Sequence, residues 1–298
     1  MASLAELRVK IGGIRSTQQI TKAMKMIAGA RLGRAQKRAG DAAVFASRLQ
    51  EIFYALLCKA GGRGDSEGEP GRWNKFRKDV HADSCVLILV TSDKGLCGGF
   101  NNSILHAASG FIKSRNEGAV SIFAVGRKAY EYCQRSNITP AAFYTNVFAS
   151  LDREQVSRMG IELIKHCEER GIMQITALYN KSKSIMRQVT VHDRVWPMQD
   201  PGDHAVTRVS GGGTVTAREP SPEAIFDEFF PLYIQAKIRQ VLSVSYASEL
   251  AARMTAMDSA SRNAQKLIDE FTLTMNNVRQ SGITRELSEI IGASEVLK

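Results

Sequence analysis

Apolar positions in the first 60 residues recur three and four residues apart, which is the spacing of a coiled-coil helix. The stripe consists of Leu4, Leu7, Ile11 and Ile14 and continues through the polar or small residues Gln18, Thr21 and Ala28. Proline, which breaks a helix interior, is absent before Pro70. The pattern therefore predicts one long helix over residues 1–60.

Helical spacing resumes at residue 223 and continues nearly to residue 298. Apolar residues there, such as Met254 and Met257, again lie three or four positions apart, and Pro231 is the last proline of the chain. A helix of about 60 residues is roughly 90 Å long, which a single compact domain cannot cover. Two such helices from one chain can cover each other, so we predict that the two terminal segments pair.

Five glycines interrupt the N-terminal pattern, at positions 12, 13, 29, 33 and 40. Each costs about 1 kcal/mol of helix stability relative to alanine. Packing against a partner offsets such a cost, and a small residue lets another backbone approach closely. A locally frayed or kinked helix is the alternative.

The middle of the chain has a different pattern, typical of an α/β domain over residues 85–198. Strands are predicted at 85–91, 119–126 and 141–148 and in the segments QITALYN and MRQVTVHDRVWPM. Helical patterns lie between them, from Ser103 to about Arg115, from the second strand through Gln134, and from the cap candidate Asp152 to Gly171. This alternation predicts a largely parallel, Rossmann-like sheet. Glycine-rich and charged stretches predict a linker at 61–84 and a loop at 199–222.

The charge of the chain is concentrated near its N-terminus. The formal net charge is +10, and nine basic residues but no acidic one occur between Arg8 and Arg38. Such an arm fits nucleic acid, anionic lipid or an acidic protein surface, or it is simply a solvated helix face. The sequence contains no run of 18 apolar residues, so no transmembrane span is predicted. The first residues lack the apolar stretch of a signal peptide.

Cysteine and histidine do not form a recognisable metal or disulfide pattern. The five cysteines are widely spaced without a CxxC pair, and the five histidines are scattered. This favours a reducing compartment and predicts no metal site and no bound cofactor.

The loop DKGLCGGFN directly follows the first predicted strand, so a phosphate cradle has to be considered. Its spacing matches neither GxGxxG nor GxxxxGK[ST], which favours a tight strand-to-helix turn. Cys97 in this loop is a candidate nucleophile, although no histidine lies nearby in sequence to activate it. The last turns, ITRELSEIIGASEVL, carry apolar residues that form either a disordered tail or a surface inserted into a partner.

Three segments together resemble one known family, the F-type ATP synthase gamma subunit. They are STQQITKAMKMIAGARLGRAQ (16–36), SDKGLCGGFN (92–101) and SELAARMTAMDSASRNAQKLIDEFTLTMNNVRQSGITRELSEI (248–290). Their order and spacing match the family, and the likeness covers nearly the whole chain. The C-terminal segment is the most specific of the three.

The resemblance implies a non-catalytic rotor shaft. In this family the two terminal helices form an antiparallel, left-handed coiled coil inside a ring of three alpha and three beta subunits. The central domain packs at the foot, beside the epsilon-type subunit (delta in mitochondria) and the membrane c-ring. Proton flow turns the ring and the shaft, and the beta subunits make ATP. The expected location is peripheral, on the matrix side of the mitochondrial inner membrane or the cytoplasmic side of a bacterial plasma membrane.

The resemblance also implies partner contacts at particular residues. Met24 and Lys25 match the MKM segment, which in the family lies near an acidic loop at the base of beta. Arg279, Gln280 and Thr284 match the RQxxIT segment, whose side chains hydrogen-bond a loop of the catalytic ring. The sequence departs from the family at Gly29, Gly33 and Lys94, and in the loops GRGDSEGEPGRWNKF and 203–220, which leaves contacts at the foot open.

Two other function classes remain compatible with the residues themselves. One is a small α/β enzyme with Cys97 as its nucleophile and the helices as dimerisation arms. The other is a basic coiled-coil protein that binds nucleic acid. The chain lacks the aromatic interleaving of such proteins, and we expect no nucleic-acid partner.

Overall fold

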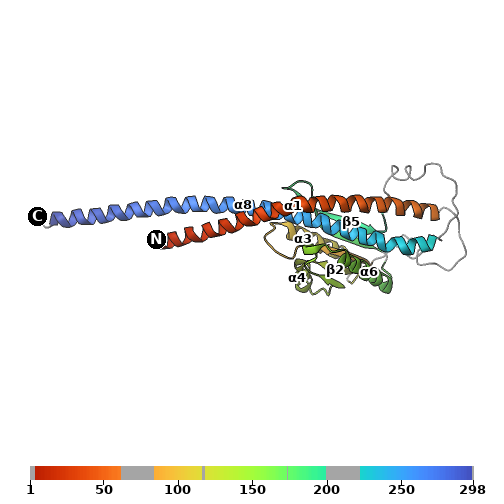
Figure 1. Cartoon of the computed structure of the whole chain (residues 1–298). Helices are drawn as coiled ribbons and strands as arrows, with labels where there is room; N and C mark the ends of the chain where they lie inside the picture. Colours follow the sequence, from red (N-terminus) through yellow and green to blue (C-terminus); the bar gives the residue numbers. More distant parts are fainter. Residues whose placement is uncertain (1–3, 62–83, 116–117, 173, 199–221, 297–298) are drawn as a thin grey trace. The chain divides into compact units, whose positions relative to one another are not determined.

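The computed structural model describes residues 4–61, 84–115, 118–172, 174–198 and 222–296. The chain divides into two compact units, Met1–Ala30 with Arg253–Lys298, and Arg31–Ala252. The two long helices, α1 (Leu4–Gly61) and α8 (Pro222–Val296), each contribute to both units (Figure 1). Of the predicted linker at 61–84 and loop at 199–222, only residues 61, 84 and 222 lie in the described part of the chain.

The first unit (unit 1) is an antiparallel pair of helices, as predicted for the chain termini. Three residue pairs within the described part of unit 1 define the register of α1 against α8. Gln18 and Lys25 form hydrogen bonds with Gln265 and Asp258, and the Met254 Sδ lies 3.4 Å from the position of a Cβ added to Gly29. Each step forward along α1, of seven and then four residues, is matched by an equal step backward along α8. A constant register of this kind is the property of a regular coiled coil.

The seam of unit 1 follows the predicted 3,4 spacing. On α1, Leu7, Ile11 and Ala28 are buried. On α8, Met257, Ala264 and Ile268 are buried at steps of seven and four. Burial of these side chains, rather than intrinsic helix propensity, stabilises both helices.

Four of the five glycines of α1 do not pack against another described helix of this chain. A Cβ at Gly12, Gly13, Gly33 or Gly40 would meet no heavy atom within 4 Å, so none of them permits a close helix approach within the described chain. Only Gly29 faces a neighbour, with the Met254 Sδ 3.4 Å from the position of an added Cβ.

The second unit (unit 2) contains a five-stranded sheet in the order β3-β2-β1-β4-β5. Its strands are β1 (Cys85–Val90), β2 (Val120–Val125), β3 (Ala142–Tyr144), β4 (Ile175–Ser182) and β5 (Gln188–Trp196). All neighbours are parallel except β4 and β5, which form a hairpin. The predicted Rossmann-like arrangement is confirmed, with β5 as an antiparallel edge strand.

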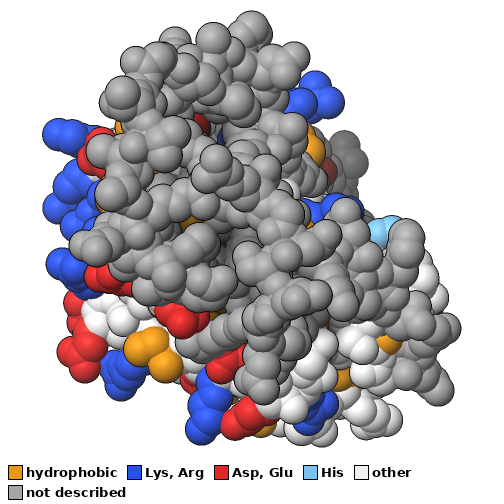
Figure 2. Space-filling model, turned by 90° about the vertical axis from the view of Figure 1, so that its right-hand side faces the viewer, with side chains coloured by type: hydrophobic (Ala, Val, Ile, Leu, Met, Phe, Trp, Pro, Cys, Tyr) orange, Lys and Arg blue, Asp and Glu red, His pale blue; other side chains and the backbone are white. Residues whose placement is uncertain are grey.

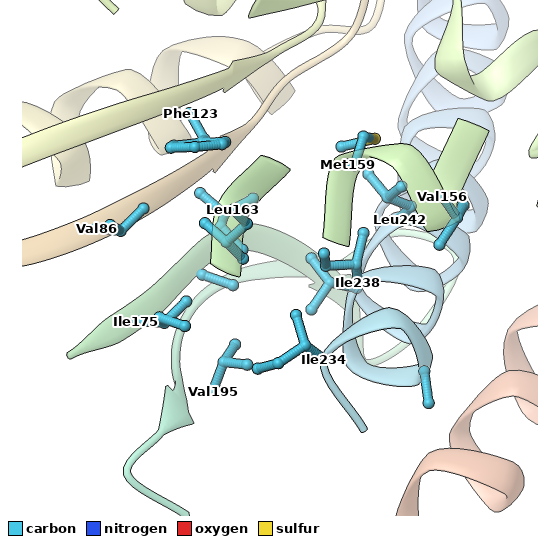
Figure 3. Packing of buried hydrophobic residues seen from close by; sticks show 14 of the residues in the cluster. Val86, Phe123, Val156, Met159, Leu163, Ile175, Val195, Ile234, Ile238 and Leu242 are labelled. Atoms are coloured by element: carbon cyan, nitrogen blue, oxygen red, sulfur yellow. The ribbon is translucent and has the colours of Figure 1, made fainter. Parts of the chain in front are cut away.

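Helices cover both faces of the sheet. They are α3 (Phe100–Lys113), α4 (Arg127–Arg135), the single turn α5 (Val147–Ser150) and α6 (Arg153–Arg170). Side chains of β1 alternate between two clusters: Leu87 and Leu89 pack with α3 and α4, whereas Val86 and Ile88 pack with α6 and parts of α1 and α8. Figure 3 shows the second cluster, where Leu163 of α6 lies beside the strands and Leu242 of α8 lies beside Met159.

Two local predictions need correction. The expected strand at 141–148 is only three residues long, because the chain turns at Asn146, which has a left-handed backbone (φ 56°), and then forms α5. Asp152 does occupy the N-cap of α6, but its side chain makes no capping hydrogen bond. Gly171 ends α6 in the left-handed conformation (φ 65°), as predicted.

The described surface bears mixed charge. Of the nine basic residues between Arg8 and Arg38, all except Lys25 are exposed. On the face drawn in Figure 2, the described Lys and Arg side chains lie among Asp and Glu side chains. Within the described residues no helix is apolar and long enough to cross a membrane.

Candidate functional site

The glycine-rich loop between β1 and α3 is held by a buried hydrogen-bond network. The Asn101 Oδ1 accepts a hydrogen bond from the Ser92 backbone N–H at 3.0 Å, and the Asn101 Nδ2 donates to the Cys97 Sγ at 3.2 Å. The carboxylate of Asp93 accepts hydrogen bonds from the backbone N–H groups of Arg127 and Asn146, both at 3.1 Å. The loop therefore ties the ends of three strands together.

Hydrogen bonds of the Asn180 side chain bridge the crevice at the switch point of the sheet. In open α/β sheets this crevice, where the strand order reverses, is the usual ligand site. Here it lies between β1 and β4, and Asn180 at the end of β4 donates to the Phe100 backbone oxygen at 2.9 Å and to the Ser103 hydroxyl at 3.0 Å. The loop DKGLCGGFN is thus a turn in which Cys97 and Asn101 are buried and hydrogen-bonded to each other.

The structure does not support Cys97 as a nucleophile. Its side chain is 2% exposed, and its Sγ accepts a hydrogen bond from the Asn101 amide. The cysteines Cys85, Cys133 and Cys167 are also free and buried. Burial raises the pKa of the Cys133 thiol to about 11 and that of Cys167 to about 12, so both stay protonated near neutral pH.

Lys25, one of the predicted contact residues, is already paired within unit 1. Its Nζ lies 2.5 Å from the Asp258 carboxylate on α8, which also accepts an ion pair from Arg262 at 3.0 Å. The hydrogen bond from Lys25 holds the pKa of Asp258 below its usual value. The three side chains leave one net positive charge at this point of the coil. Met24 beside them is half-buried.

Sequence reasoning missed Asp258 as the partner of Lys25. The signal that could have found it is the heptad register, because the pair Gln18–Gln265 places residue 258 opposite residue 25. However, the register of α1 against α8 can be derived from sequence only if one pair of facing residues is already known.

Arg279, Gln280 and Thr284 lie on the exposed surface of α8. Gln280 and Thr284 line one shallow groove together with Asn277, Ser281, Arg285 and Ser288. Arg279 does not line that groove, and it lies about 100° further round the helix than Gln280. The predicted set therefore presents two adjacent faces rather than one.

The end of α8 extends past the described part of α1. The constant register of unit 1 places Leu4, the first described residue of α1, opposite Arg279. Beyond that point Ile283, Leu287 and Ile290 are 51%, 54% and 66% exposed and lie on one stripe of the helix. These apolar side chains form a bare strip (the α8 tip).

Comparison with known proteins identifies the family of this chain. A family model described as ATP synthase matches residues 3–297. The chain is 36% identical to an ATP synthase gamma chain of Chlorobium chlorochromatii, with 100% of this chain and 99% of that protein covered. It is likewise 36% identical to the ATP synthase gamma chain of a Geobacter species, over 100% of both chains. The chain belongs to the ATP synthase gamma chain family.

Solved structures of the family share the architecture. A chain from the central stalk and c-ring of the Tetrahymena thermophila mitochondrial ATP synthase superposes with a TM-score of 0.59 and 25% identity, covering 81% of this chain and 99% of that one. A chain of the Euglena gracilis mitochondrial ATP synthase gives a TM-score of 0.63 at 18% identity, covering 99% and 94%. At that identity the second likeness supports the fold alone.

Proposed function

We propose that this chain is the central-stalk rotor of an F-type ATP synthase. In this role it transmits proton-driven rotation of a membrane c-ring to the alpha and beta subunits of the catalytic ring. The observation that carries the proposal is the full-length similarity to ATP synthase gamma chains, combined with an antiparallel coiled coil whose α8 tip has no described partner.

The geometry of unit 1 suits a shaft that works inside a ring of three equivalent partners. One asymmetric helix pair cannot contact three copies in the same way, so it stabilises a different conformation in each. Differential contact of this kind is the requirement for coupling between sites. The Lys25–Asp258–Arg262 cluster adds stiffness, because it joins both helices at the level of the family's MKM segment.

The chain itself is non-catalytic in this proposal, and ATP chemistry belongs to the beta subunits. The packed switch-point crevice and the buried Cys97 favour this over an α/β enzyme. The epsilon-type subunit (delta in mitochondria) and the c-ring are its expected neighbours at the foot. Its location is then peripheral on an energy-transducing membrane, on the matrix or the cytoplasmic side.

Isolation of the assembly tests the function directly. We expect the tagged chain to co-purify with a nucleotide-binding hexamer at one copy per six ring subunits, as measured by mass spectrometry of the intact complex. A homodimer of this chain with no ring attached would contradict the proposal.

The proposed contact residues are tested by the double variant Arg279→Ala with Gln280→Ala. Hydrogen bonds to a charged group are worth about 1.5–3 kcal/mol each, and 1.4 kcal/mol corresponds to a tenfold change in rate. We therefore expect a fall of about tenfold or more in ATP synthesis by reconstituted complex, with unchanged thermal unfolding of the chain. The matched control is Asn263→Ala with Lys266→Ala, which removes an exposed amide and cation of the same helix. Equal activity of the two double variants would count against this contact.

A further inference from the structure

Unit 2 contains a hollow whose lining includes neither the residues of the switch-point crevice nor the predicted ring contacts. It has a volume of about 640 Å³ and lies between α1, the start of α6 and α8. Small-molecule sites in proteins typically measure about 300–1,000 Å³. Three segments far apart in sequence build it, from residues 38–45, 151–156 and 232–243.

The floor of the hollow is apolar and its small side chains create the space. Ala42 and Ala236 are 8% and 4% exposed, and Leu151 and Val156 close the floor beside them. Phe45 stands at one wall with 54% of its surface exposed. An exposed aromatic ring that lines a hollow can stack on a flat ligand.

The rim of the hollow carries three arginines from three different elements: Arg38 of α1, Arg153 of α6 and Arg239 of α8. All three side chains are exposed. The α6 N-terminus lies at the same rim, and the Asp152 side chain makes no capping bond there. Its helix dipole adds positive potential to that of the guanidinium groups. Asp41, one turn after Arg38 on α1, is the one acidic side chain among the described residues of the lining.

We propose that this hollow binds a nucleoside di- or triphosphate. Guanidinium groups bind phosphate oxygens through paired hydrogen bonds, so the three arginines would hold the phosphate chain. Phe45 and the alanine floor would receive the base, and the Asp41 carboxylate would accept hydrogen bonds from ribose hydroxyls. A purely acidic ligand would leave Phe45 and Asp41 without a role, which is why a nucleotide fits better than a bare polyanion. The site is separate from the crevice at the switch point of the sheet, and it does not depend on the rotor role.

The test uses the purified full-length chain, so that no nucleotide site of another subunit contributes. Binding of ATP, ADP and inorganic tripolyphosphate is measured by isothermal titration calorimetry. We expect saturable ATP binding that weakens at least tenfold in Arg38→Ala with Arg239→Ala. The control Arg158→Ala with Arg187→Ala removes two exposed arginines of unit 2 outside the hollow and should leave the affinity unchanged. Circular dichroism of each variant verifies folding.

A second variant separates a nucleotide site from a general anion site. Phe45→Ala should weaken ATP binding severalfold and leave tripolyphosphate binding unchanged. Arg38→Lys with Arg239→Lys keeps both charges and should retain most of the ATP affinity lost in the alanine variant. The proposal is overturned if ATP does not bind, or if its affinity is the same in the arginine variant and the control. It is also overturned if tripolyphosphate binds as tightly as ATP and Phe45→Ala affects neither.

Discussion

Gly126→Ala is expected to prevent unit 2 from folding stably, with a loss of about 4 kcal/mol or more of unfolding free energy. Gly126 follows β2 with φ 91°, a conformation that side chains rarely adopt. A Cβ there would lie 2.2 Å from the Thr91 backbone oxygen and 2.8 Å from its carbonyl carbon. Backbone atoms of a buried strand end cannot move aside as a flexible side chain could.

The same strand end holds several other bonds that any shift would break. The Thr91 hydroxyl accepts a hydrogen bond from the Ala129 backbone N–H at 2.8 Å, and the Gly126 N–H donates to the Tyr144 oxygen at 2.8 Å. Together they connect β1, β3 and the first turn of α4. Displacing Thr91 would therefore disturb the junction of the sheet with α4.

The control for this prediction is Gly171→Ala. Gly171 also has a left-handed backbone, with φ 65°, but nothing lies within 4 Å of the position of its Cβ. It should lose only about 1 kcal/mol, the usual difference for a left-handed glycine position. Urea unfolding followed by circular dichroism compares the two variants. Similar losses in both would show that the close approach to Thr91 does not matter.

Phe53→Ala is expected to cost about 3–5 kcal/mol of unfolding free energy, the range for truncating a buried phenylalanine. The Phe53 side chain is fully buried where α1, β5 and α8 meet. Its ring centroid lies 5.7 Å from that of Tyr233 and 6.1 Å from that of Trp196. Neither neighbour can collapse into the space, because Tyr233 donates a hydrogen bond to the Val195 oxygen and Trp196 packs edge-on against Phe230.

The matched control is Phe45→Ala, two turns earlier on the same helix. Phe45 is 54% exposed, so its loss should change stability by no more than about 0.5 kcal/mol, as for most surface substitutions. Thermal unfolding of both variants provides the comparison. A small shift for Phe53→Ala would mean that α1 is not anchored to the sheet of unit 2 through this aromatic cluster.

These two substitutions address unit 2, whereas the proposed ring contacts lie in unit 1. Gly126→Ala and Phe53→Ala should thus lower the amount of assembled complex rather than the rate per complex. Arg279→Ala with Gln280→Ala should instead lower the rate per complex and leave the amount of assembled complex unchanged. Activity normalised to the amount of intact complex distinguishes the two kinds of defect.

The type and order of the main helices and strands follow from the amino-acid pattern alone. The 3,4 spacing of Leu4 to Ala28 predicts the seam that the structure buries, because a helix returns the same face at this period. The apolar runs at 85–91 and 119–126 predict central parallel strands, because both faces of such strands are covered. The family segments also lie in the sequence itself, and they sufficed to indicate the rotor role.

The contacts of individual side chains, in contrast, become visible only in the folded chain. The pairing of Lys25 with Asp258 depends on a register between helices 233 residues apart. Periodicity determines the face of a residue on each helix and says nothing about the offset between two helices. For the same reason the glycines of α1 could not be judged from sequence, and four of the five face open space. The clearest cases are Cys97 and the three arginines of the hollow. Cys97 is buried, and the arginines lie at one rim, because segments far apart in sequence come together when the chain folds.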